Sequence, residues 1–151
     1  MKLEIEYEWE PFSVDQICYM HSTHFNIRLN RDSCSHWGPA IYKWEGAINQ
    51  SRHEHNGKTG LLIGETQDLR ARLKQYATGT QPNGNLWWRK NFLECGQIGF
   101  YILKINRLLI NNRLEHPQLD RKNWRLVLEQ ILVLEAVRDA TPRQWVVNKM
   151  Q

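Results

Sequence analysis

Four residues in separate parts of the chain carry side chains from which catalytic sites are commonly built. Tyr42 follows two apolar residues in a short strand-like run, and Arg72 and Tyr76 are spaced i, i+4 on one edge of an expected helix. Glu135 falls on the inward-facing apolar stripe of a late helix, where a carboxylate needs a cation or hydrogen bonds. Taken singly, each has an ordinary structural explanation: a core aromatic, a surface cation, or an ion-pair partner of a nearby base such as Arg138 or Arg72. Only their arrangement can carry a functional interpretation.

A second group with metal-ligand chemistry lies near the amino end and comprises Cys18, His21, His24, Cys34 and His36. Two cysteines with two or three histidines could hold a structural zinc ion. The second pair is spaced C-x-H, however, which is not a usual zinc-finger spacing. We therefore do not expect structural zinc at Cys18, His21, Cys34 and His36. The chain's 3 cysteines cannot all pair, which indicates a reducing compartment, and the start lacks the pattern of a signal peptide. We expect a cytoplasmic protein.

Residues 1–37 are expected to form an extension ahead of the main domain. Residues 2–9 alternate apolar and charged side chains, which predicts a half-buried edge strand. Ser13 has the form of an N-cap with Gln16 three residues later, which predicts a short helix through about His21. The extension is thus a strand followed by a helix.

The main domain, residues 38–151, is expected to open with a hairpin. Residues 41–44 and 60–64 are short apolar runs typical of strands. Between them, Asn56-Gly57 is the strongest short turn signal in the chain.

Helices alternate with one further strand in the rest of the domain. Asp68 is placed to cap a helix that runs to about residue 77, and residues 86–94 predict a second helix. Residues 98–105 are apolar on both faces, as in a central strand covered on both sides. A polar, basic connection at 106–122 then leads to a long helix over 124–139.

The order of these residues resembles the GIY-YIG endonucleases. This family includes the amino-terminal nuclease domain of bacterial excision repair, group I intron homing enzymes and some restriction enzymes. Ala40-Ile41-Tyr42 is similar to the first signature motif and Leu62-Ile63-Gly64 to the second. The remaining matches are Arg72 and Tyr76 on the following helix, Glu135 on the late helix, and Asn148 after it. The resemblance extends from Gly38 to Lys149.

The resemblance implies an α+β fold in which helices flank a small central antiparallel three-stranded sheet. It also implies hydrolysis of DNA phosphodiester bonds with one divalent ion, Mg²⁺ or Mn²⁺, held by Glu135. Arg72 would contact the phosphate, Tyr42 would position or deprotonate the attacking water, and Tyr76 would assist.

Three positions depart from the family pattern. Ala40 replaces a glycine, which is a mild change. Leu62 replaces the second motif's tyrosine, and leucine can neither donate nor accept a hydrogen bond. Glu65 places a negative charge near the expected phosphate. The missing hydroxyl would then have to be replaced from Tyr76, His53 or His55.

Charge is distributed unevenly along the chain. Residues 1–30 contain two basic residues (Lys or Arg) and five acidic residues (Asp or Glu). Residues 66–125 contain eleven basic and four acidic residues. This basic middle suggests a polyanion-binding face, and charge alone leaves a solvated cationic face as an equal alternative. Given the resemblance, we expect DNA contacts from Arg70, Lys74, Trp88, Arg89, Lys90 and Asn148.

Two other functions remain open. The first is a nuclease fold that binds DNA or another nucleic acid but no longer cleaves it, since Leu62 has lost the hydroxyl. The second is a protein-interaction domain whose acidic amino-terminal strand adds to a partner's sheet. A homodimer is a further alternative, whereas no apolar run is long enough to cross a membrane.

Overall fold

The structure, a computed structural model, describes residues 1–12, 14–21, 24–29, 38–48, 51–78 and 98–148. For 14–21, 24–29, 74, 77, 78 and 98 it describes the backbone alone. In chain order the elements are β1 (Leu3–Phe12), β2 (Val14–His21), β3 (His24–Leu29), β4 (Ala40–Ala47), β5 (Thr59–Thr66), α1 (Leu69–Thr78), β6 (Ile98–Ile110), β7 (Arg113–Glu115), α3 (Lys122–Asp139) and β8 (Gln144–Val146).

The main sheet has six strands in the order β1-β6-β4-β5-β8, with β7 paired to β6 as well. The pairs β1–β6, β6–β4 and β4–β5 are antiparallel, whereas β8 runs parallel to β5. Strand β4 therefore lies in the middle, and Tyr42 is flanked in register by Gly64 of β5 and Ile102 of β6.

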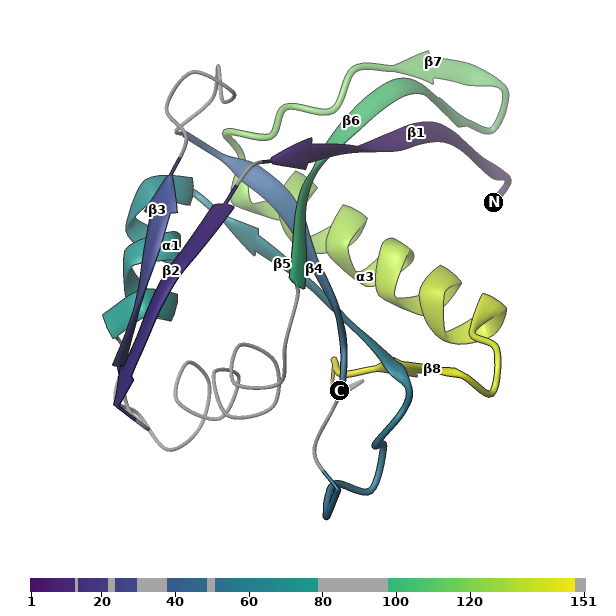
Figure 1. Ribbon diagram of the computed structural model, residues 1–151. Helices are drawn as coiled ribbons and strands as arrows, with labels where there is room; N and C mark the ends of the chain where they lie inside the picture. The colour runs from purple at the N-terminus through teal and green to yellow at the C-terminus, as the bar shows by residue number, and fades with distance from the viewer. Residues whose placement is uncertain (13, 22–23, 30–37, 49–50, 79–97, 149–151) are drawn as a thin grey trace.

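The two described helices cover opposite faces of this sheet (Figure 1). On the α1 face, the buried cluster includes Phe12, Tyr42, Trp44, Leu69, Leu73, Tyr76 and Phe100. On the α3 face, it includes Ile41, Ile63, Leu103, Leu128, Leu132 and Val133. Neighbouring strand residues point to opposite faces, so Ile41 and Tyr42 belong to different cores.

Several local predictions are confirmed. The fold is α+β, and β1 is an edge strand whose apolar residues are half-buried while Glu4, Glu6, Glu8 and Glu10 are exposed. Helix α1 begins after Asp68, whose Oδ1 accepts a hydrogen bond from the backbone N–H of Ala71 at 3.1 Å. The loop between β4 and β5 turns at Asn56-Gly57, where Gly57 has φ of 85°.

Three predictions are corrected. The sheet has six strands rather than three, because β1 and β7 both pair with β6 and β8 adds beside β5. The segment expected as a helix from Ser13 to His21 contains strand β2, paired with β3 in a separate two-stranded sheet. Val14, Ile17 and Tyr19 favour strands, and the N-cap pattern did not outweigh them.

The third correction concerns the connection expected at 106–122. Strand β6 continues to Ile110, turns through Asn111 and Asn112, and returns as β7. Both asparagines have positive φ, 50° and 65°, which fits a two-residue hairpin turn. The helix predicted over 86–94 lies outside the described residues. Within the described part of the chain, neither helix has the length and apolar composition of a membrane span.

Candidate functional site

The Tyr42 and Tyr76 side chains meet beneath the α1 face of the sheet. Their hydroxyl oxygens are 2.8 Å apart and share a hydrogen bond, and their rings pack edge to face at 6.0 Å. Tyr42 is 2% exposed and Tyr76 is 6% exposed, so both side chains are buried. A strand and a helix that are distant in sequence thus join two of the predicted site residues directly.

Gly64 makes room for this pair. It lies opposite Tyr42 in the β4–β5 ladder, and a Cβ atom there would collide with the Tyr42 ring and hydroxyl. Glycine is therefore required at this position of the second motif for a steric reason, since the phenol ring of Tyr42 occupies the space that a side chain would fill. In contrast, Leu62 is half-buried and packs against the apolar cluster on the same face.

Arg72 and Glu129 lie near enough to the two phenols for their charges to shift the pKa values of both. The charges of both residues act on both tyrosines, and Arg72 also acts on Glu129. Each is half-buried, whereas the tyrosines are buried. Three of the predicted residues, Tyr42, Arg72 and Tyr76, are therefore brought together.

Burial decides the protonation of the two tyrosines. It raises the pKa of Tyr42 well above its ordinary value and also raises the pKa of Tyr76, although the Arg72 charge opposes both shifts. Both phenols are therefore neutral near pH 7. A neutral hydroxyl can orient a water molecule or donate to an oxyanion, but it is a poor general base.

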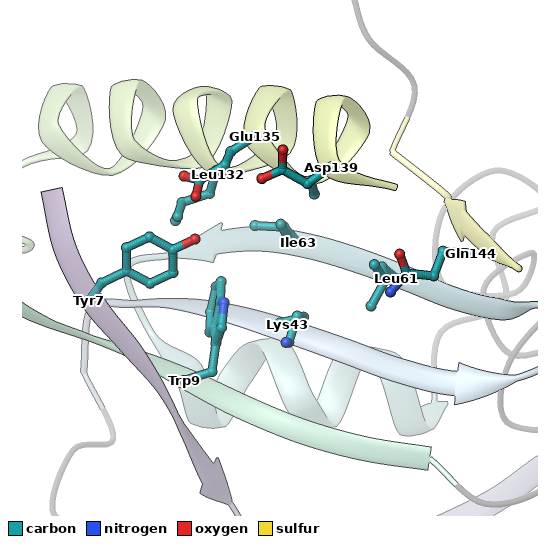
Figure 2. Close-up of a pocket in the computed structure, with 10 residues that line it drawn as sticks. Tyr7, Trp9, Lys43, Leu61, Ile63, Leu132, Glu135, Asp139 and Gln144 are labelled. Atoms are coloured by element: carbon teal, nitrogen blue, oxygen red, sulfur yellow. The ribbon is translucent and has the colours of Figure 1, made fainter. Parts of the chain in front are cut away.

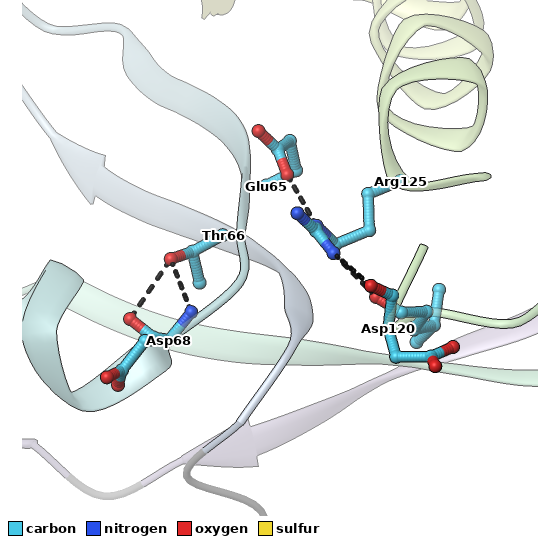
Figure 3. A network of polar contacts seen from close by, with 6 residues as sticks. Glu65, Thr66, Asp68, Asp120 and Arg125 are labelled. Atoms are coloured by element: carbon cyan, nitrogen blue, oxygen red, sulfur yellow. Dashed lines mark hydrogen bonds and ion pairs between the residues drawn. The ribbon is translucent and has the colours of Figure 1, made fainter. Parts of the chain in front are cut away.

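The side chain of Glu129 is an unusually weak acid for a carboxyl group. Burial, followed by the charge of Glu65, raises its pKa to about 7, while Arg72 opposes the shift. Glu65 is itself bound to Arg125, which is 2% exposed, with Nε donating to the carboxylate at 2.6 Å (Figure 3). The negative charge expected near the site at Glu65 is thus paired with Arg125, although it still raises the pKa of Glu129.

Arg125 also fixes where α3 begins relative to the sheet. Its Nη1 donates to the backbone carbonyls of Leu119 and Asp120 at 2.9 Å and 3.2 Å (Figure 3). One guanidinium therefore joins the end of β5, the turn before α3 and the first turn of α3. Glu129 is one helical turn beyond Arg125, so this contact helps to position Glu129 beside Arg72.

Glu135 lies in a different place. It lines a groove of about 220 Å³ between α3 and the sheet, together with Tyr7, Trp9, Lys43 and Asp139 among others (Figure 2). Burial and then the Glu135 carboxylate raise the pKa of Tyr7 to about 12. The predicted metal ligand is thus a neighbour of Tyr7, on the sheet face opposite Tyr42.

Asn148 holds the carboxyl end of the chain against β5. Its Oδ1 accepts from the backbone N–H of Ile63 at 2.9 Å, and its Nδ2 donates to the Ile63 carbonyl at 2.6 Å. The backbone N–H of Val147 also bonds to the Leu61 carbonyl at 2.8 Å. The amide of Asn148 therefore continues the ladder of β8 on β5, next to Gly64.

The other predicted residues are placed as follows. Arg70 is exposed on α1, and Lys74 is on the same helix with no side chain described. Trp88, Arg89 and Lys90 lie outside the described residues, as do Cys34 and His36, while Cys18 and His21 fall in β2, where only backbone is described. His53 and His55 pack on Trp145 beside the β4–β5 loop, at the end of the ladder remote from Thr66.

The group in this cluster that could bind a hard cation is the carboxylate of Glu129. Glu129 and Glu65 are carboxylates close enough to repel one another, and a divalent ion would favour the ionised form of Glu129. Among the residues that the structure describes, no group of three or more His, Cys, Asp or Glu side chains could hold a metal. Water and phosphate oxygens would therefore have to complete the coordination, as is common for Mg²⁺.

Glu129 was not among the predicted site residues. Helical spacing selected Glu135, which is indeed half-buried, because it repeats i+7 from Leu128. The inward side of α3 is broad, however, and Glu129 and Glu135 lie on different flanks of it. In the sequence, Glu129 is a carboxylate next to Leu128 and one helical turn after Arg125. Ranking it above Glu135 as a site residue requires the register of α3 on the sheet.

No family model, curated protein or solved structure matches the chain.

Proposed function

We propose that the protein is a metal-dependent endonuclease that hydrolyses DNA phosphodiester bonds. The single observation that carries the proposal is the cluster of Tyr42, Tyr76, Arg72 and Glu129, in which two phenols share a hydrogen bond beside one guanidinium and one carboxylate. This set combines an anion-binding group, a carboxylate suited to a hard cation, and hydroxyls able to orient water. These are the parts that phosphodiester hydrolysis needs.

Each residue has a role that follows from its environment. Arg72 binds the phosphate, because its planar guanidinium can donate to two oxygens at once. Glu129 holds Mg²⁺ or Mn²⁺, the role expected at Glu135 from the sequence. The ion, when bound, neutralises charge on the phosphate and the leaving oxygen. Tyr42, supported by the Tyr76 hydroxyl, orients the attacking water as a neutral donor.

DNA would approach from the side where Arg72 and Glu129 reach solvent. Arg70 lies two residues before Arg72 on α1. It is exposed and can contact a backbone phosphate. Lys74, Trp88, Arg89 and Lys90 remain proposed contacts on the basis of their charge and aromatic character. We place the reaction in the cytoplasm, as the cysteine content suggests.

The test is nicking of supercoiled plasmid by wild type, Glu129→Gln and Glu135→Gln, with Mg²⁺, with Mn²⁺ and with chelator. The two variants make the same change on the same helix, and both glutamates are half-buried. We expect metal-dependent nicking that falls on the order of a hundredfold or more in Glu129→Gln only. Equal loss in both variants would contradict the assignment of Glu129. Absence of nicking by wild type on plasmid, branched and damaged DNA would contradict the nuclease.

Leu62 favours a second candidate, a DNA-binding module that does not cleave. Its side chain packs with the apolar cluster near Tyr42 and contributes no hydroxyl. Such a module would retain binding through Arg72 and the basic segment. DNA binding that is lost in Arg72→Ala but unchanged in Glu129→Gln, without any nicking, would support this candidate over the nuclease.

A further inference from the structure

The outer face of α3 is unusual for a helix that faces solvent. Leu126, Val127, Leu134 and Val137 are 38%, 54%, 52% and 42% exposed. At 100° per residue they lie on one stripe about 100° wide, together with the exposed Asn123 and Gln130. The six charged residues of α3 all fall outside this stripe, which we call the outer stripe.

The spacing within the outer stripe is that of a helix-pairing seam. Asn123, Val127, Gln130, Leu134 and Val137 follow one another at intervals of 4, 3, 4 and 3 residues. This alternation keeps one row of side chains directed at a neighbouring helix. Leu128 and Leu132 on the opposite side are already buried against the sheet. A helix that is apolar on two opposite sides is expected to be covered on both.

We propose that the outer stripe binds a second copy of this chain, with the two α3 helices antiparallel across a two-fold axis at Gln130. In a symmetric contact, the residue on the axis meets its own copy. A glutamine can do this favourably, since its amide is both donor and acceptor. The same alignment places Leu126 of one copy opposite Leu134 of the other, because both lie four residues from Gln130.

The length of the outer stripe gives the size of the contact. From Asn123 to Val137 the helix is about 21 Å long. A helix pair of this length buries on the order of 1,000 Å² in total, the lower end for a specific interface. Buried area alone does not set affinity, but an interface of this size belongs to the class of weak contacts that form as concentration rises. Such a dimer would bring two nuclease sites into one particle, and only this consequence rests on the proposed function.

The first experiment is sedimentation of the full chain from about 1 µM to about 200 µM, without DNA. We expect wild type to change from monomer to dimer within this range and Leu134→Lys to remain monomeric. Leu114→Lys is the matched control, because Leu114 is 57% exposed but lies on β7. A monomeric wild type throughout the range, or equal weakening by both variants, would overturn the proposal. Far-UV circular dichroism checks that each variant is folded.

A second pair of variants tests whether the partner is a second copy aligned on Gln130. Gln130→Glu keeps the side-chain shape but sets two carboxylates against each other at the axis. Gln75→Glu makes the same change at an exposed position of α1. We expect dimer affinity at pH 8 to fall at least tenfold in Gln130→Glu and to stay within twofold of wild type in Gln75→Glu. Unchanged affinity in Gln130→Glu would refute the proposed alignment, whatever the result at Leu134.

Discussion

At the scale of single residues, the candidate site depends on how tightly Tyr42 is packed. The phenol is enclosed by Tyr76, by Phe100 at a ring distance of 5.6 Å and by the bare Cα of Gly64. Such enclosure holds the hydroxyl in one place and keeps it neutral. Precise placement of a donor is what a water-orienting role requires.

Gly64→Ala tests this packing. The new methyl group would push the Tyr42 ring away from Tyr76, so we expect a loss of roughly 1–3 kcal/mol in the free energy of unfolding and a fall in nicking. Gly64 has no positive φ, so the effect is steric. Gly38→Ala is the control, since a Cβ there has no atom within 4 Å. Urea unfolding measures both, and equal stability of the two variants would show that Tyr42 can move at little cost.

At the scale of elements, the position of α3 relative to β5 decides which glutamate meets Arg72. The apolar contacts of Leu128, Leu132 and Val133 hold α3 on the sheet, but such contacts are not directional. The Glu65–Arg125 ion pair is directional and lies at the end of the helix that contains Glu129. We infer that the ion pair fixes the register of α3 and the apolar face fixes its orientation.

Glu65→Gln tests the energetic side of this contact. It leaves the buried Arg125 guanidinium without its counter-charge, and we expect destabilisation of about 3 kcal/mol. The control is Glu6→Gln, which removes an exposed pair to Arg107 at 3.8 Å and should cost under about 0.5 kcal/mol. Chemical denaturation of both variants at pH 7 provides the comparison. A cost for Glu65→Gln as small as that of the control would mean that hydrogen bonds to Leu119 and Asp120 suffice to hold Arg125.

At the scale of the whole molecule, the sheet separates two different environments. The α1 face contains the Tyr42–Tyr76 pair, and the α3 face contains the groove at Tyr7 and Glu135. Helix α3 has a different neighbour on each side: the sheet core, the Arg72 cluster through Glu129, and the proposed second copy through the outer stripe. Any change in its position would therefore affect all three.

The stability of the whole molecule should depend on pH through Glu129. The folded-state pKa of about 7 exceeds the ordinary 4.5, so between these values the folded protein keeps a proton that the unfolded chain releases. The Glu129 contribution therefore makes the free energy of unfolding decrease as pH rises from about 4.5 to 7. We expect Glu129→Gln to resemble wild type at pH 4 and to be the more stable of the two at pH 8, as measured by urea unfolding. A constant difference between them across this range would contradict the raised pKa.

Local chemistry alone accounts for much of the fold. Period-two alternation predicted β1, Asp68 and the 3.6-residue period predicted α1 and α3, and Asn56-Gly57 predicted a turn. These features depend on neighbours within a few residues, so they can be recognised in the sequence. The turn at Asn111 and Asn112 between β6 and β7 is also a local feature. Residues 106–122 were nevertheless predicted to form a polar connection without a hairpin.

The sequence by itself thus determined the local elements and the presence of Tyr42, Arg72 and Tyr76 on a strand and a helix that could meet. Only the tertiary structure decided that the sheet has six strands, that Asn148 binds the backbone of Ile63, and that Glu129 rather than Glu135 lies beside Arg72. The physical reason is that these contacts join residues far apart in the chain. Their geometry follows from strand register and from the Glu65–Arg125 pair, neither of which has a local signature.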